Sequence, residues 1–131
     1  MGNEFDNIEL HKIYPDVIVW TQAEICTGDS LNAQLDHITQ ILNQRENFIL
    51  ITDGRNLKQR PTVEDNLAIK NFLKNSINLK HVIFIDSKFN KLIKYFLRFQ
   101  FDKKIPIPYT LVKNSEEAFR EVEKIIPEKI S

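Results

Sequence analysis

The chain has 131 residues, a length typical of one domain, so residues 1–131 are treated as a single domain. Eighteen basic residues balance eighteen acidic ones, and this zero net charge argues against a nucleic-acid partner, whose binding depends on phosphate neutralisation. Cys26 is the only cysteine, which excludes an internal disulfide and a thiolate metal cluster. No stretch approaches the roughly 20 apolar residues of a transmembrane segment, and no signal-peptide pattern opens the chain. We therefore expect a cytoplasmic protein.

The first third of the chain predicts an antiparallel hairpin followed by a helix. Residues 8–14 alternate loosely, and residues 16–24 contain a β-branched and aromatic run, so two strands are expected around a short turn. After candidate N-caps at 27–30, apolar residues recur at spacings of four, three and four, which predicts a helix. Its apolar face consists of Leu31, Leu35, Ile38 and Leu42, and its polar face of Asn32, Gln34, Asp36 and Gln40.

The stretch 47–55 predicts the central strand of a sheet. Four apolar residues, 48–51, run unbroken and stop at Thr52-Asp53-Gly54-Arg55, a pattern typical of a buried strand closed by a turn. A loop follows over 56–61. Thr62 is then placed to cap the next helix, with Asp65 three residues later as in a capping box.

The rest of the chain predicts two more strands and two more helices. Residues 79–85 form an apolar strand, residues 88–101 a helix, residues 109–112 a short strand, and residues 115–126 a final helix. Strand–helix alternation implies right-handed crossovers and a parallel sheet. We therefore predict an α/β fold with a mixed sheet of about five strands, an N-terminal antiparallel hairpin, and about four helices mainly on one face.

Asp53 and Asp86 are the two candidate acids. Each directly follows an apolar strand, so both are expected at the same edge of the sheet. Two carboxylates there could bind a metal or transfer protons, or each could hydrogen bond within its own turn. No histidine or third acid converges on them, and the three glycines form no phosphate-binding loop. We favour the structural role, and expect no enzymatic activity, no cofactor and no metal.

The helix predicted over 88–101 carries unusual aromatic surface. Tyr95, Phe96, Phe99 and Phe101 cannot all be buried on one narrow stripe of a helix. Some of this surface is therefore a candidate for contact with a small ligand, a lipid or a second chain. Because Trp20 adds to the aromatic surface that one core must cover, a homodimer is an open alternative.

The order of these elements resembles the STAS superfamily, the domains of anti-sigma-factor antagonists and sulfate-transporter tails. The resemblance rests on the opening hairpin, the central strand 48–53 with its loop, the strand 82–86, and the helix start Ser115-Glu-Glu-Ala-Phe119. It implies a non-enzymatic regulatory module in which the helix after the central strand begins at a serine or threonine that is a kinase target. Thr62 falls at the matching place, so it is a candidate phosphorylation site, with a plain N-cap as the alternative.

Our favoured interpretation is a protein-binding module that uses the loop 53–62 and the adjoining strand end. A ligand- or lipid-binding domain with a pocket near 95–101 is the alternative, and an enzyme that uses Asp53 and Asp86 comes third. The residues expected to contact a protein partner are Asp53, Gly54, Arg55, Asn56, Lys58, Arg60, Asp86 and Ser87.

Overall fold

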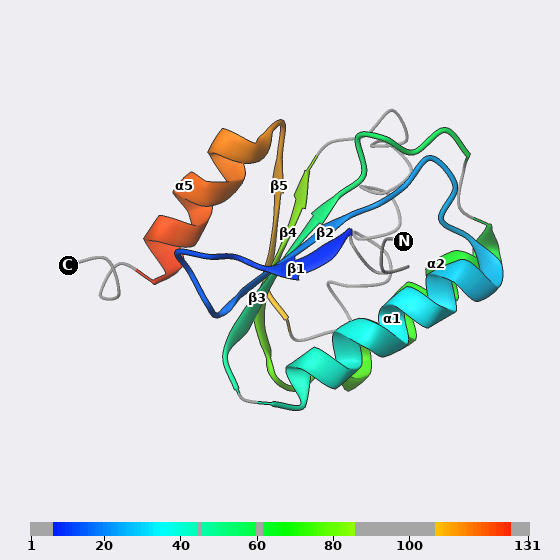
Figure 1. The fold of residues 1–131 in the computed structure, drawn as a ribbon, viewed down its shortest axis with the longest axis horizontal. Helices are drawn as coiled ribbons and strands as arrows, with labels where there is room; N and C mark the ends of the chain where they lie inside the picture. The colour runs from blue at the N-terminus through cyan, green and yellow to red at the C-terminus, as the bar shows by residue number, and fades with distance from the viewer. Residues whose placement is uncertain (1–6, 45, 60–61, 86–106, 127–131) are drawn as a thin grey trace.

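A mixed five-stranded sheet forms the centre of the structure, a computed structural model that describes residues 7–44, 46–59, 62–85 and 107–126 (Figure 1). The strands lie in the order β1-β2-β3-β4-β5; β1 is antiparallel to β2, and the other pairs are parallel. This arrangement confirms the predicted α/β class, hairpin and parallel units. The elements are β1 (Ile8–Leu10), β2 (Val17–Thr21), α1 (Gly28–Leu42), β3 (Phe48–Asp53), α2 (Val63–Asn75), β4 (Leu79–Ile85), β5 (Tyr109–Val112) and α5 (Ser115–Ile125).

The described helices cover both faces of the sheet (Figure 1). All six residues of β3 are buried, because successive side chains point to opposite faces and both faces are packed. Phe48 and Leu50 belong to the cluster beneath α1 and α2, whereas Ile49 and Ile51 pack with the residues of α5. The prediction placed the helices mainly on one face; among the described residues α1 and α2 share one face and α5 covers the other. The predicted helix over 88–101 lies outside the described residues.

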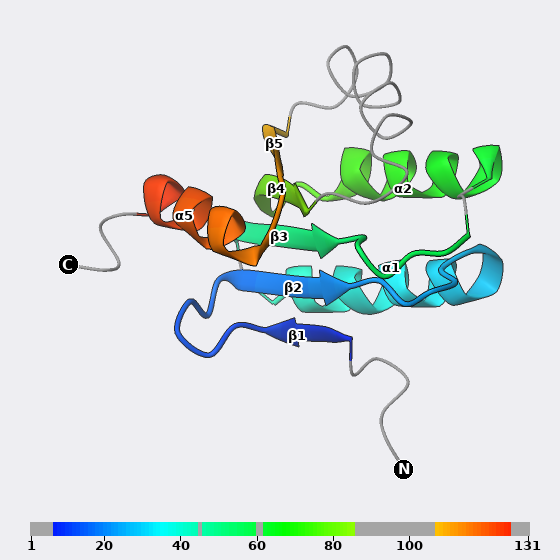
Figure 2. The same ribbon diagram turned by 90° about the horizontal axis from the view of Figure 1, so that it is seen from above.

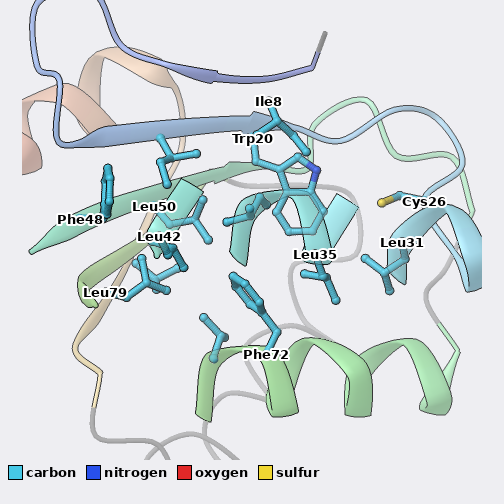
Figure 3. Close-up of a cluster of buried hydrophobic side chains, with 14 of the residues drawn as sticks. Ile8, Trp20, Cys26, Leu31, Leu35, Leu42, Phe48, Leu50, Phe72 and Leu79 are labelled. Atoms are coloured by element: carbon cyan, nitrogen blue, oxygen red, sulfur yellow. The ribbon is translucent and has the colours of Figure 1, made fainter. Parts of the chain in front are cut away.

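The core beneath α1 and α2 contains Trp20, which is 2% exposed (Figure 3). Its indole Nε1 donates a hydrogen bond of 2.7 Å to Oε1 of Gln34, and Asn7 Nδ2 donates to the same oxygen at 2.9 Å. Gln34 is buried, so placing it on the polar face of its helix was wrong; the buried indole N–H needs an acceptor there. Since Trp20 is covered by its own chain, it offers no surface for a second copy.

The hairpin between β1 and β2 has shorter strands than its sequence predicts. Residues 11–16 form a turn in which Nδ1 of His11 accepts the backbone N–H groups of Ile13 and Tyr14 at 3.1 and 3.2 Å. The turn packs against α5, with the His11 and Phe119 rings 4.8 Å apart. The Tyr14 hydroxyl donates to Glu123 Oε1 at 3.4 Å. The N-terminal hairpin is thus fastened to the C-terminal helix.

Candidate interaction site

Asp53 ends β3 with its carboxylate enclosed by Arg55. Oδ1 accepts the backbone N–H and Nε–H of Arg55, each at 3.0 Å, and Oδ2 accepts Nη2–H at 2.8 Å. Burial alone would raise the pKa of Asp53, but these hydrogen bonds to a cation outweigh it and hold the pKa below its usual value. A carboxylate used in this way stabilises its turn, which favours the structural role over acid–base chemistry.

The side chain of Arg55 also joins this turn to α5. Its Nη2 donates a hydrogen bond of 3.0 Å to Oγ of Ser115, the first residue of α5. The guanidinium side chain remains 44% exposed. No local pattern predicts this contact between residues 60 positions apart. Because β3 and β5 run in the same direction, the end of β3 and the start of α5, which follows β5, lie at the same edge of the sheet.

Two loops lie side by side at this edge, the β2 loop (residues 22–27) and the β3 loop (residues 54–59); Figure 2 shows them at the end toward which β2 and β3 point. The backbone N–H of Gln22 donates to the carbonyl of Asp53 at 2.8 Å, and that of Lys58 to the carbonyl of Glu24 at 2.8 Å. Lys58 Nζ lies 3.1 Å from Glu24 Oε1, and both side chains are exposed. Backbone pairing therefore sets the spacing of the loops.

Between the two loops lies a hollow of about 470 Å³. Leu57 anchors its base, because this side chain is 3% exposed and belongs to the core beneath α1 and α2. Gly54 is buried, and its carbonyl accepts the Leu57 N–H at 3.2 Å. The structure brings together the predicted residues Arg55, Asn56 and Lys58, and adds three that the sequence did not single out. The lining residues are Ala23, Glu24, Arg55, Asn56, Leu57 and Lys58.

Asp65 connects the starts of α1 and α2. Its Oδ2 accepts the Thr62 N–H at 2.9 Å and its own N–H donates to Thr62 Oγ1 at 3.1 Å, which confirms the predicted capping box. Its Oδ1 accepts the N–H of Gly28 at 2.9 Å, which the sequence did not indicate. Gly28 has φ +56°, a left-handed conformation that favours glycine. Burial would raise the pKa of Asp65, but these hydrogen bonds lower it below the usual value.

Cys26 lies buried beside this junction. Burial raises the pKa of its thiol to about 11, and the negative charge of Asp65 adds to the increase, while a hydrogen bond with Gln34 opposes it. The thiol is therefore protonated near neutral pH. A protonated, buried thiol is a poor nucleophile, so Cys26 belongs to the core rather than to a reactive site.

Several predicted site residues cannot be placed in this arrangement. Arg60, Asp86 and Ser87, and the aromatic residues Tyr95, Phe96, Phe99 and Phe101, lie outside the described residues. Within the described residues no three histidine, cysteine or acidic side chains converge on a metal-sized site. The described helices include none that is long and apolar enough to cross a membrane. Comparisons with protein-family models, curated proteins and solved structures each find no match to this chain.

His81 gives a pH-dependent test of the packing between the sheet and α5. Its Nε2 lies 2.8 Å from Thr110 Oγ1, and burial lowers the pKa of the imidazole below 6.5, against a smaller opposing effect of Glu121. The unfolded chain then binds a proton at higher pH than the folded one, so the stability that neutral His81 contributes is present above pH 6.5 and is lost as pH falls below it.

We expect the free energy of unfolding of the parent to fall between neutral and mildly acidic pH by more than that of His81→Gln. Urea titrations of both proteins above and below pH 6.5, the usual pKa of histidine, measure the difference. Equal pH dependence in the two proteins would show that His81 does not couple protonation to folding.

Proposed function

We propose that this chain is a non-enzymatic regulatory module that resembles STAS domains and binds a protein partner at the hollow between the β2 and β3 loops. The observation that carries the proposal is that the exposed side chains of Arg55, Asn56 and Lys58 surround one hollow on loops fixed by backbone hydrogen bonds. Loops that are already ordered lose little conformational entropy when a partner binds. Arginine is also enriched at protein interfaces, where its planar group makes several hydrogen bonds.

The chemistry of Asp53 supports a binding role over a catalytic one. Both carboxylate oxygens accept hydrogen bonds from Arg55, and the pKa lies below its usual value. A general base needs a free lone pair directed at its substrate and a pKa near the working pH. Asp53 is instead suited to hold Arg55 in place at the rim of the hollow.

The partner experiment uses the immobilised protein to capture proteins from an extract of the cell that makes it. Lys58→Glu reverses a charge at the hollow, and Lys12→Glu makes the same change on the exposed hairpin turn. We expect to find a protein that the parent and Lys12→Glu retain and that Lys58→Glu loses. The reversed charge at position 58 would repel the acidic groups of the partner that face the hollow. A partner that binds all three proteins equally would place the interface elsewhere.

Phosphorylation of Thr62 is proposed as the switch of this site. Thr62 is exposed, but its Oγ1 accepts the N–H of Asp65, whose carboxylate is bound to the Thr62 N–H in return. A phosphate there would bring about two negative charges next to that carboxylate. Repulsion would loosen the hydrogen bond from Gly28 to Asp65, which anchors the end of the β2 loop.

The switch is tested in the same capture experiment with the phosphorylated protein, identified by mass spectrometry. We expect phosphorylation of Thr62 to weaken capture of the partner. Thr62→Val cannot be phosphorylated, so its capture of the partner should be the same with and without kinase treatment. If Thr62 carries no phosphate under any growth condition, the switch is absent, although the interaction site is untouched by that result.

A further inference from the structure

A groove of about 470 Å³ runs between α1 and α2. Its floor is apolar and comes from both helices: Leu35 and Leu42 from α1, and Ala68 and Phe72 from α2. Exposed polar side chains of the same two helices form its walls. The groove is separate from the hollow between the β2 and β3 loops, since the two share no lining residue.

The walls of the groove are made of amide side chains rather than charged ones. Asn32 and Asn43 lie on the α1 side, and Asn71 and Asn75 on the α2 side. Among the described residues that line the groove, Asp36 is the only charged one. Each amide carries both donors and acceptors, so it can pair with the same group on an identical surface. A wall of like charges would instead repel its own copy.

Ile77 projects at the end of this groove, and its side chain is 91% exposed. Two hydrogen bonds fix the turn that carries it: Ser76 Oγ donates to the Phe72 carbonyl at 2.5 Å, and Asn78 Nδ2 donates to the Leu42 carbonyl at 2.7 Å. An apolar projection is therefore held next to an apolar recess on one surface. In a two-fold symmetric interface the same patch of both copies meets, so the patch must be complementary to itself. A projecting isoleucine beside an apolar groove meets this requirement.

We propose that two copies of this chain form a symmetric dimer in which Ile77 of each copy packs into the α1–α2 groove of the other. The amides of the groove walls then pair across the interface, and the zero net charge of the chain imposes no overall repulsion between the copies. The contact differs from the dimer surface expected around Trp20, which is buried. The groove and the hollow between the β2 and β3 loops share no lining residue, so variants of the groove test the dimer separately from the proposed partner.

The test is sedimentation equilibrium of the full chain from about 1 μM to about 1 mM, which covers weak to moderate association. Ile77→Asp puts a carboxylate into the groove of the second copy and is expected to raise the dimer Kd at least tenfold. Ile13→Asp is the matched control, because Ile13 is also an exposed isoleucine, 75% exposed, but lies on the hairpin turn. It should leave the Kd unchanged.

A second variant fills the groove without changing Ile77. Asn71→Trp adds a large side chain at an exposed position on the α2 wall, and it should weaken the dimer as Ile77→Asp does. Circular dichroism verifies that both variants remain folded. A parent that is monomeric throughout the concentration range, or a dimer that survives both variants, overturns the proposal. So does native mass spectrometry that finds another protein or a small molecule on a monomeric parent.

Discussion

Replacing Asp65 with alanine is expected to lower the free energy of unfolding by about 3 kcal/mol. Asp65 is 5% exposed, and its carboxylate accepts the N–H groups of Gly28 and Thr62, so its loss leaves two backbone donors without their charged acceptor. One of these donors begins α1 and the other precedes α2, so both helix starts are weakened together. Chemical unfolding followed by circular dichroism measures the change.

Glu64→Ala is the matched control for this prediction. Glu64 is adjacent to Asp65 in the first turn of α2, but it is exposed, so its removal should change stability by no more than about 0.5 kcal/mol. The pKa of Asp65 adds a second signature. Because the folded-state pKa is below 3.8, the stabilisation is present above that pH and is lost as pH falls through the folded-state value. Equal losses in the two variants would contradict the bridging role.

Replacing Gln34 with leucine is expected to lower the free energy of unfolding by about 2 kcal/mol, although the leucine and glutamine side chains have similar volumes. Oε1 of Gln34 accepts hydrogen bonds from Trp20 Nε1 and Asn7 Nδ2. Trp20 is 2% exposed, so its indole N–H cannot turn to water when the acceptor is removed. Gln40→Leu makes the same substitution at an exposed position of α1 and should be nearly neutral.

A double-mutant cycle isolates the indole hydrogen bond. Trp20→Phe removes the N–H donor, so Gln34→Leu should cost about 1 kcal/mol less in that background than in the parent. Additive losses would mean that the 2.7 Å contact contributes nothing specific. In that case Gln34 would stabilise the core through its packing and its other partners alone.

Local pattern was sufficient to predict the sheet and the start of α2. The run Phe48–Asp53 became a strand buried on both faces, as a short apolar run closed by turn residues predicts. Thr62 and Asp65 formed the predicted capping box because all its partners lie within one helical turn. Alternation of strands and helices likewise predicted the parallel pairing, because a helical crossover returns the chain to the same end of the sheet.

Contacts between distant residues were beyond the reach of these patterns. The hydrophilic amide of Gln34 predicts a place on the polar face of its helix. In the structure this amide is buried, because it accepts the hydrogen bond of the Trp20 indole. The bond from Gly28 to Asp65 spans 37 positions, and that from Arg55 to Ser115 spans 60. No periodicity encodes such pairs. The placement of α5 on the opposite face of the sheet similarly depends on how Ala118 and Val122 pack against β3 and β4.

The most direct test of the proposed interaction site is an amide-resolved NMR footprint of the partner on the isotope-labelled chain. The partner is the protein that the parent captures from cell extract and Lys58→Glu does not. The site predicts that signal changes concentrate in residues 22–28 and 54–59, which line or support the hollow. Changes confined to the α1–α2 groove or to the hairpin turn, with the two loops unaffected, would contradict the assignment of the β2 and β3 loops as the binding surface.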